Sequence, residues 1–520
     1  MIARVFSTMV SLAALTGLTQ PAIAGWNRAD TQHFIIYSDG STNQLEEFAS
    51  DLERFDSLMK QLLGVRPESD PVQLPIYLVQ NANRVSLLMG DDDRMIAGVY
   101  IPTSDGSFIL GNREWDGKDD ELPGRVVLFH EYAHHLMFRH LTNAYPAWYR
   151  EGFAEFLSTS KIERDGTFSI GAPANHRAYA IREGVYMPIE RLLFTPQSEM
   201  TDNERGMFYA QSWVLTHYLQ SSVELNRQML SYFSMLAKEK DPREAAVEAF
   251  GDLDALDKAV RKYGRRRIDY RRSNTPLEIR GDIEITSLTD LETDLAENEL
   301  YLRIGFKPDQ VLKDLNQIIE ENPKNAKAYA LLAQAESDRA HSEEDYDFDA
   351  ALKAVDRAIQ LDPDLIEARV RKAYLLMEPA DHEEMSDQQV DWAAVRDQIS
   401  AANAIDADDP RPLLAYVTSL EKEGGPMPPV ALDAMMQVHG TMPEVTPIRT
   451  RLARMLAAEG RFDAALSLVG FLVAEPHAGD SGRKLVEEIR TMQAAVDNET
   501  RNAAASSSVS ESASGVNEET

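Results

Sequence analysis

Apolar and polar positions change their spacing along the chain, and the change predicts different structures for its two halves. Over residues 25–120, short apolar runs alternate with helical periodicity. The runs HFIIYS at 33–38 and VQLPIYLV at 72–79 are typical of strands, whereas residues 45–63 repeat apolar positions at helical spacing. Pro75 lies inside the second run and favours an edge position for that strand, because proline cannot donate to a sheet ladder.

A turn and a long helical stretch complete the N-terminal half. The runs at 99–101 and 108–110 flank the sequence TSDG, which predicts a β-hairpin. From about residue 120 to 272 the periodicity is mostly helical. A small group of strands followed by helices is the order of an α+β domain, and we expect one over residues 25–275.

Beyond residue 285 the sequence shows paired helical patterns with repeated features. The pentapeptide FDAAL occurs at 348–352 and again at 462–466, and Pro323 and Pro363 interrupt the periodicity. Small residues lie where two helices must approach closely, at Ala333, Ala351, Ala358, Ala453 and Ala465. These features resemble tetratricopeptide repeats, which stack helix pairs into a solenoid. The resemblance implies an all-α helical-repeat domain over residues 285–497, with generic helix pairs as the alternative.

The two ends of the chain are expected to lie outside these domains. Arg4, an apolar run at 10–18 and the A-x-A sequence at 22–24 are typical of a signal peptide over residues 1–24. Residues 498–520 consist mostly of Asn, Ala, Ser and Glu, and we expect a disordered tail there because they cannot bury a core.

Composition and charge narrow the cellular setting and the partners. The formal net charge is −32, which argues against binding nucleic acid or anionic lipid. No later segment is long and apolar enough to form a transmembrane span. The chain contains no cysteine, so it forms no disulfides, which fits a bacterial periplasm or exterior. We therefore expect an exported bacterial protein, periplasmic or secreted.

The sequence HEYAH at 130–134 is the strongest chemical signal in the chain. On a helix, His130 and His134 stand one turn apart on the same face, where two imidazoles can bind one zinc ion. Glu131 then lies beside them as a general base. Apolar residues on both sides of the motif predict a core helix at 124–140.

A second helix, predicted at 147–158, supplies further candidates. It carries Glu151 and Glu155 on one face, where like charges repel unless a cation or a donor lies between them. We expect Glu151 to be the third metal ligand and Glu155 to accept a hydrogen bond from the second nitrogen of a ligand histidine. Gly152 costs about 1 kcal/mol in a helix interior relative to alanine. We attribute it to a close approach of the two metal-bearing helices.

The segment WYREGFAE at 148–155 is close to the E-G-F-A segment of aminopeptidase-type enzymes. Together with the histidine motif, it resembles the gluzincin metallopeptidases of the peptidase MA-like group, which contains thermolysin and aminopeptidase N. The resemblance implies a zincin-like domain, a Zn²⁺ cofactor held by His130, His134 and Glu151, and a peptide or protein substrate. It also implies a downstream tyrosine that stabilises the oxyanion, for which Tyr209 is the candidate; a tyrosine packed with its hydroxyl at the surface is the alternative.

Signals for substrate recognition are fewer. The region 98–112 contains no motif of the kind that reads a substrate's free amine in aminopeptidases, which leaves endopeptidase activity or another specificity. The expected strand at 108–110 offers a sheet edge to which an extended peptide can add. The remaining histidines near the motif, His135, His140 and His217, are expected to be structural or exposed.

These features together predict a zinc metallopeptidase with an α+β zincin-like domain followed by an all-α, tetratricopeptide-like domain. Zinc would polarise the scissile carbonyl and activate water, and Glu131 would take the proton. The repeats would bind a protein partner or position substrates. The alternative is a periplasmic scaffold or chaperone-like quality-control protein whose peptidase domain is weakly active or inactive.

Overall fold

The computed structural model describes residues 25–66, 72–91, 96–114, 123–140, 145–238, 240–344, 346–382, 385, 389–470 and 481–514. The predicted signal peptide at 1–24 lies outside these residues.

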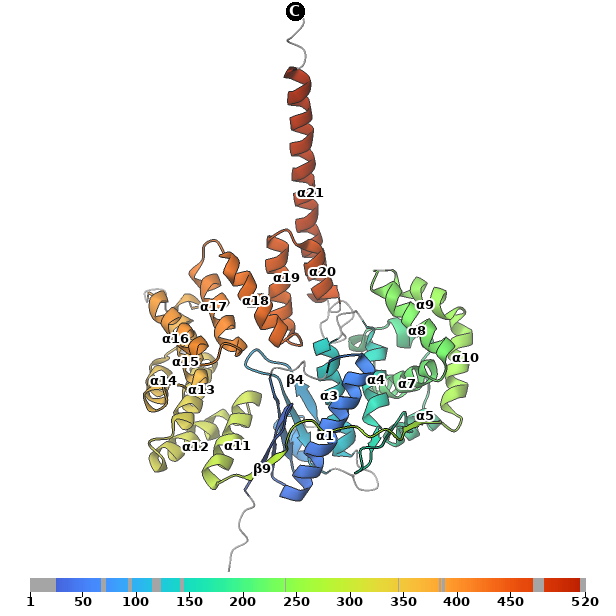
Figure 1. The fold of residues 1–520 in the computed structure, drawn as a ribbon, viewed down its shortest axis with the longest axis horizontal. Helices are drawn as coiled ribbons and strands as arrows, with labels where there is room; N and C mark the ends of the chain where they lie inside the picture. The colour runs from blue at the N-terminus through green and yellow to red at the C-terminus, as the bar shows by residue number, and fades with distance from the viewer. Residues whose placement is uncertain are drawn as a thin grey trace, which may run out of the picture.

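A six-stranded mixed sheet is the framework of the N-terminal half (Figure 1). Its strands lie in the order β4-β5-β3-β2-β1-β9. Their bounds are β1 Asn27–Asp30, β2 Phe34–Ser38, β3 Leu74–Val79, β4 Val99–Ile101, β5 Phe108–Asn112 and β9 Glu284–Ser287. β3 is parallel to both β2 and β5, and the other pairs are antiparallel.

The sheet corrects three expectations about strand position. β5, the expected edge strand, lies between β4 and β3, so β4 is the edge strand on that side. β3 is also an interior strand. Pro75 is tolerated there because it stands near the beginning of the strand, opposite Ile35, where a missing N–H donor costs the sheet little. β9 pairs with β1, so the sheet takes a strand from beyond the domain boundary expected at residue 275.

Helices fill the rest of this half. They are α1 Thr42–Leu63, α2 Ala82–Leu88, α3 Gly124–His140, α4 Ala147–Ser158, α5 Ala178–Glu183, α6 Ile189–Phe194, α7 Asp202–Gln220, α8 Val223–Leu236, α9 Pro242–Phe250 and α10 Leu253–Gly264. Two short 3-10 helices are η1 Asn175–Arg177 and η2 Gln197–Glu199, and a second sheet has the order β6 Lys161–Ile162, β7 Phe168–Ile170, β8 Arg271–Ser273. One hydrophobic core joins the sheet to α1, α3, α4 and α7. In it, Phe55 of α1 stacks on Phe129 of α3 with ring centroids 3.9 Å apart.

The C-terminal half is an all-helical array that curves around one side of the sheet (Figure 1). Its helices are α11 Asp290–Ile304, α12 Pro308–Glu321, α13 Ala326–Ser342, α14 Asp349–Leu361, α15 Ile366–Met377, α16 Trp392–Ile405, α17 Pro410–Glu423, α18 Pro429–Thr441, α19 Thr446–Ala458 and α20 Phe462–Val469, with the 3-10 helix η3 Glu378–Ala380 after α15. Each helix from α11 to α20 packs on the next one, and α11, α13, α15 and α17 also contact one another in succession.

The turns between helix pairs repeat the same local geometry. The turns at 322–325, 362–365 and 442–445 each close with a backbone hydrogen bond from the fourth residue to the first, of 3.0, 3.3 and 3.2 Å. The stacked helices and recurring turns agree with the predicted helical-repeat architecture. They continue through 364–445, where the sequence resembles tetratricopeptide repeats least.

Two contacts hold the array against the N-terminal half. At its beginning, α11 buries Ala296 and Leu300 in a core with Trp26 and Phe108 of the sheet region. Further along, the turn between α18 and α19 reaches the end of α3. There, the Glu444 carboxylate pairs with Arg139 at 3.1 Å and accepts a hydrogen bond of 3.0 Å from the Ser107 hydroxyl.

The last helix, α21, corrects the expected start of the disordered tail. α21 runs from Ser481 to Ser514 and projects from the rest of the molecule (Figure 1), whereas the tail was expected from residue 498. The beginning of α21 buries Leu485 and Ile489 against α19 and α20, which anchors the helix to the array. Residues 515–520 lie outside the described part of the chain. No helix among the described residues is both long and apolar enough to cross a membrane.

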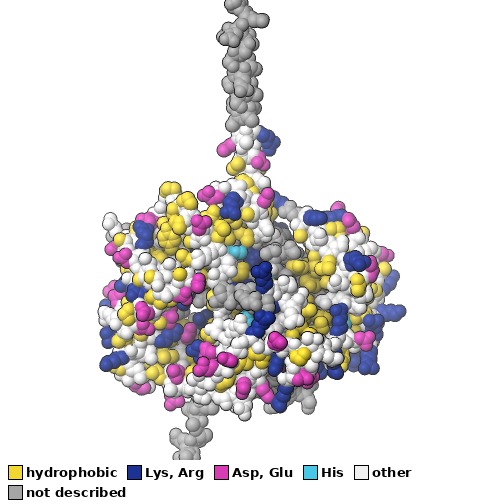
Figure 2. Space-filling view, in the orientation of Figure 1, with side chains coloured by type: hydrophobic (Ala, Val, Ile, Leu, Met, Phe, Trp, Pro, Cys, Tyr) yellow, Lys and Arg dark blue, Asp and Glu magenta, His cyan; other side chains and the backbone are white. Residues whose placement is uncertain are grey.

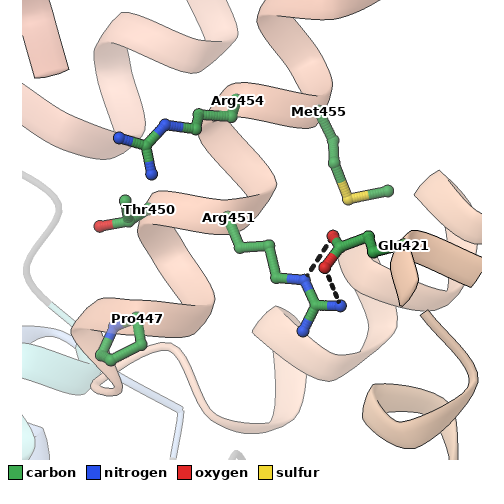
Figure 3. A pocket seen from close by; sticks show the side chains of 6 residues that line it. All are labelled: Glu421, Pro447, Thr450, Arg451, Arg454 and Met455. Atoms are coloured by element: carbon green, nitrogen blue, oxygen red, sulfur yellow. Dashed lines mark hydrogen bonds and ion pairs between the residues drawn. The ribbon is translucent and has the colours of Figure 1, made fainter. Parts of the chain in front are cut away.

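The surface carries mixed charges and one pocket on the array. Acidic and basic side chains are interspersed over the face seen in Figure 2. A pocket of about 440 Å³ is lined by Glu421, Pro447, Thr450, Arg451, Arg454 and Met455 (Figure 3). Arg451 pairs with Glu421 and Arg454 pairs with Glu488, so both cations at this pocket already have carboxylate partners.

Candidate metal centre

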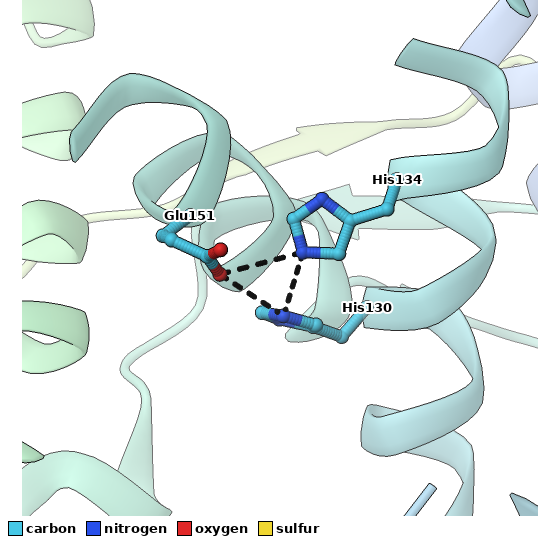
Figure 4. Close-up of side chains that lie close together, drawn as sticks. All are labelled: His130, His134 and Glu151. Atoms are coloured by element: carbon cyan, nitrogen blue, oxygen red, sulfur yellow. Dashed lines mark hydrogen bonds and ion pairs between the residues drawn. The ribbon is translucent and has the colours of Figure 1, made fainter. Parts of the chain in front are cut away.

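Two neighbouring helices bring the predicted ligands together. α3 presents His130 and His134 from adjacent turns, and α4 packs beside it and presents Glu151 toward both imidazoles (Figure 4). The bounds of α3 and α4 are those expected from the sequence, 124–140 and 147–158. The side chains of the three candidates are 15%, 13% and 10% exposed, so the site is mostly shielded from water.

The three donor atoms have the mutual spacing of ligands around one ion. The Nε2 atoms of His130 and His134 lie 3.1 Å apart, and Oε2 of Glu151 lies 3.4 and 3.3 Å from them. Zinc bonds of roughly 2.0–2.1 Å in tetrahedral geometry place ligand atoms about 3.3 Å apart. Oε2 of Glu151 is buried and, within the described part of the chain, makes no hydrogen bond of good geometry. A divalent cation would satisfy this oxygen, so the residues fit zinc.

The pKa values of this group are set mainly by the attraction between its carboxylates and its imidazoles. Burial would raise the pKa of Glu151, but the imidazoles of His134 and His130 hold it well below its usual value. Burial would lower the pKa of His130, but Glu151, Glu155 and Glu131 raise it to about 9. The group therefore favours positive charge between the carboxylate and the imidazoles, which a metal ion supplies as well as protons do.

Glu155 lies beside His130, but its carboxylate is too far from the ring for the expected hydrogen bond. Its Oε1 is 3.9 Å from Nδ1 of His130. The same carboxylate bonds to Nε2 of His176 at 2.8 Å and accepts a hydrogen bond of 3.1 Å from Nε of Arg177. Burial would raise the pKa of Glu155, but Arg177 and His176 lower it to about 2. The carboxylate is therefore charged and fixed next to the ligand imidazole.

His176 and Arg177 were not foreseen from the sequence. Both belong to η1, a three-residue helix between β7 and α5. Arg177 also lies over the ring of Tyr209, with its guanidinium carbon 5.2 Å from the ring centroid. Neither residue stands at a characteristic spacing from the HEYAH motif, and only the fold reveals their contact with Glu155.

The candidate base Glu131 touches the edge strand. Its Oε2 accepts a hydrogen bond of 3.1 Å from the backbone N–H of Tyr100 in β4. Burial raises the pKa of Glu131, and the charges of His130 and His134 oppose this rise. The carboxylate of Glu131 therefore lies between the helix that carries the candidate ligands and β4, the edge strand of the sheet.

Tyr209 reaches the same neighbourhood from α7. It is half-buried, and the charge of Glu151, followed by burial, raises the pKa of its hydroxyl. The hydroxyl therefore keeps its proton at neutral pH and can donate a hydrogen bond. Arg177, which bonds to Glu155, lies over the Tyr209 ring, so one contact separates Tyr209 from Glu155, although α7 begins more than forty residues after α4 ends.

Gly152 corrects one expectation about helix packing. A Cβ atom built at Gly152 would lie 2.3 Å from Oγ1 of Thr216 and 2.4 Å from the carbonyl oxygen of Ser212. Both residues belong to α7. The glycine therefore permits a close approach of α4 to α7 and not, as expected, of α4 to α3.

The side of α3 that faces α1 is anchored by a buried polar network. The Tyr132 hydroxyl donates to Asp56 of α1 at 2.7 Å. Asp56 also pairs with Lys60 at 3.1 Å, and Glu53 bonds to His33 at 2.8 Å. Lys60 pairs with Asp56 and His33 bonds to Glu53, so both carboxylates of this buried cluster already have partners, and we interpret the cluster as structural.

Two of the three remaining histidines near the motif, His135 and His217, lie outside the candidate metal group, and the third, His140, is the last residue of α3. Nδ1 of His135 is 3.0 Å from the Tyr100 hydroxyl. His217 bonds to the Tyr263 hydroxyl at 2.7 Å and to the carbonyl oxygen of Gly171 at 2.9 Å. Both rings are buried and have structural partners, in line with the sequence analysis.

Comparison with known proteins adds little to this geometry. No protein-family model matches the chain, and no curated protein matches it. Among solved structures, the chain is similar to TTC0263, a thermophilic TPR protein of Thermus thermophilus, with 15% identity, a TM-score of 0.30, and coverage of 39% of this chain and 99% of that one. It is also similar to MamA (41-end) from Desulfovibrio magneticus RS-1, with 15% identity, a TM-score of 0.26, and coverage of 39% and 98%. At these TM-scores, the architecture rests on the helices and turns described above.

Proposed function

We propose that the chain is a zinc-dependent peptidase in which the helical array binds a protein partner or positions the substrate. The observation that carries the proposal is the spacing of 3.1–3.4 Å among the donor atoms of His130, His134 and Glu151, next to the carboxylate of Glu131. Two imidazoles and one carboxylate leave a fourth position open, as in catalytic zinc sites. Export to a bacterial periplasm or exterior is part of the proposal and rests on the sequence of residues 1–24.

The residues around the ligands have separate roles in this reaction. A bound zinc ion would polarise the scissile carbonyl and acidify water. Glu131 accepts the proton from the attacking water and passes it to the leaving amine. Tyr209 donates a hydrogen bond to the oxygen that becomes negative. Glu155, charged and fixed by Arg177, orients the ring of His130 through its Nδ1 side.

The edge strand gives the substrate its direction. β4 is the outer strand of the sheet, and the N–H of Tyr100 points away from β5 toward Glu131. An extended peptide that adds to this edge runs past Glu131 and the metal ligands. The stretch 98–112 carries no amine-reading motif, so we assign internal peptide bonds as the substrate class.

Replacing Glu131 with glutamine tests the proposal. Glu131→Gln keeps the size and hydrogen-bonding shape of the side chain but removes the base. We expect unchanged metal content and at least about a 100-fold loss of cleavage of a peptide library. Glu224→Gln, at an exposed glutamate of α8, is the matched control and should leave cleavage unchanged. Wild-type turnover by Glu131→Gln would exclude it as the base.

A scaffold function is the second candidate, and one contact favours it. Glu131 is engaged by the N–H of Tyr100, so the base and the edge strand occupy each other in this structure. A chain that remained in this state would bind partners through its array without cleaving them. The same experiment separates the two: a scaffold gives no cleavage in the wild type above that of Glu131→Gln.

A further inference from the structure

A second group of metal-ligating side chains lies in the helical array, away from α3 and α4. It consists of His341 at the end of α13, Glu378 at the start of η3, and His382 shortly after η3. The ligand atoms of all three lie within 4.8 Å of one another. Nothing in the candidate peptidase mechanism uses them.

The distances from the carboxylate to the two imidazoles in this group are like those in the first one. Oε2 of Glu378 lies 3.3 Å from Nε2 of His341 and 3.2 Å from Nε2 of His382. Two imidazole nitrogens therefore converge on one carboxylate oxygen. The separations are again close to the roughly 3.3 Å expected between neighbouring ligands of a tetrahedral zinc ion.

One hydrogen bond fixes the position of a proton on His341. Nδ1 of His341 is 2.8 Å from the backbone carbonyl oxygen of Ser337, which only accepts hydrogen bonds, so Nδ1 carries a proton. In the neutral ring, Nε2 then presents a lone pair toward the negative oxygen of Glu378. Two lone pairs at 3.3 Å repel each other unless a cation lies between them or the ring takes a second proton. A carbonyl bond on the far nitrogen is also the usual way in which proteins orient a ligand histidine.

The rings are held in place while the site stays accessible. The ring of Tyr346 stacks on His382 with centroids 4.0 Å apart, and Phe348 lies 5.0 Å from His341. The His341 side chain is 42% exposed, whereas Glu378 and His382 are 13% and 16% exposed. An ion can enter from the side of His341, and water can complete its coordination there.

We propose that His341, Glu378 and His382 bind a divalent transition-metal ion of the zinc class, which ties the end of α13 to η3. Two neutral imidazoles and one carboxylate suit zinc and its neighbours rather than calcium or magnesium, which prefer oxygen ligands. The site is structural: it joins two helical elements separated by α14 and α15. This proposal does not depend on the proposed peptidase function.

Metal analysis of the full-length chain tests it. After dialysis against zinc at pH 7.5, the wild type should hold about two ions per chain, and both His130→Ala/His134→Ala and His341→Ala/His382→Ala about one. His439→Leu removes a histidine of the array outside the group and should keep about two. Cobalt in place of zinc should give the visible bands of a tetrahedral site in His130→Ala/His134→Ala.

The possible outcomes are distinct. If the wild type holds a single ion that disappears in His130→Ala/His134→Ala, the second site is excluded and the first one stands. If a single ion disappears only in His341→Ala/His382→Ala, the reverse holds. Should that double variant fail to fold by circular dichroism, Glu378→Gln replaces it. Loss of one ion in Glu378→Gln supports the site, whereas retention of both ions overturns it, because Glu378 would then not be a ligand.

Discussion

At the scale of single residues, Gly152 decides how α4, the helix that carries the candidate ligand Glu151, packs in the core. Its α-carbon lies against the backbone of α7 at Ser212, where any side chain would collide with main-chain atoms. The two neighbours of Gly152 in the sequence are the candidate ligand Glu151 and Phe153 of the core. The helix that carries this candidate ligand is thus packed closely against α7, the helix that carries Tyr209.

Gly152→Ala should destabilise the protein and disturb the metal site. The added methyl group would lie 2.4 Å from the Ser212 carbonyl, so α4 or α7 must shift. We expect a loss of about 1–3 kcal/mol in the free energy of unfolding, typical of overpacking, together with weaker zinc binding. Urea denaturation and zinc titration measure the two effects.

Gly206 of α7 provides the matched control, since a Cβ there would meet no atom within 4 Å. Gly206→Ala should raise the free energy of unfolding by up to about 1 kcal/mol, because alanine is the better helix former. If both alanine variants behave alike, close packing is not the reason for Gly152.

At the scale of elements, the sequence predicts what local periodicity controls and misses what distant pairing controls. The bounds of α3 and α4, and the meeting of His130, His134 and Glu151, follow from helical spacing and one short connection. The edge position of β4 could not be predicted in this way, because it depends on which strands pair with β5 in the folded sheet. A strand at 108–110 looks the same in sequence at an edge or inside a sheet.

The contacts of η1 illustrate the same limit for the site. His176 and Arg177 contact Glu155, although β6 and β7 separate them from α4 in the sequence. A three-residue 3-10 helix has no periodicity to detect, and neither residue type is unusual on a surface. Their role becomes visible only when the fold places them against a buried carboxylate.

α18 carries a histidine whose titration should weaken the array in acid. Burial, and then the charge of Arg449, lowers the pKa of His439 from 6.5 to about 4. Between about pH 6.5 and pH 4, the unfolded chain therefore binds a proton at His439 that the folded chain does not bind. The stabilisation is complete above about pH 6.5 and is lost as the pH falls toward about 4, with an upper figure of about 3 kcal/mol.

Comparing the wild type with His439→Leu isolates this contribution. Leucine removes the titrating group, so the free energy of unfolding of the variant should fall less between pH 6.5 and pH 4 than that of the wild type. Denaturation curves at several pH values give the difference. Parallel pH profiles for the two proteins would exclude His439 as the cause.

At the scale of the whole molecule, the array contacts α3, the helix that carries the candidate ligands His130 and His134. Arg139, one turn beyond His135 on α3, donates to the carbonyl oxygen of Thr441 at 2.9 Å and pairs with Glu444. Arg449 donates to the carbonyl oxygen of Phe138 at 3.1 Å. Because the Arg139 and Glu444 side chains are only 5% and 4% exposed, this pair is a buried joint between the two halves.

Glu444→Gln should loosen this joint and with it the end of α3. The substitution leaves the buried charge of Arg139 without its carboxylate, which costs about 3 kcal/mol when such a pair is broken. Hydrogen exchange measured by mass spectrometry should rise in peptides from the end of α3 and from the α18–α19 turn, before it rises elsewhere. Zinc binding at His134, which lies on the same helix, should weaken as its backbone becomes mobile.

An exposed pair gives the comparison that decides the point. Arg164 and Glu47 are ion-paired at 2.9 Å with side chains 95% and 60% exposed, and Glu47→Gln should cost about 1 kcal/mol or less. If Glu444→Gln changes hydrogen exchange no more than Glu47→Gln does, the contact with the array does not stabilise the end of α3. A local rise in hydrogen exchange at the end of α3 and in the α18–α19 turn would instead mean that the array stabilises α3, the helix that carries His130 and His134. A partner bound to the array could then influence the candidate metal site through this contact.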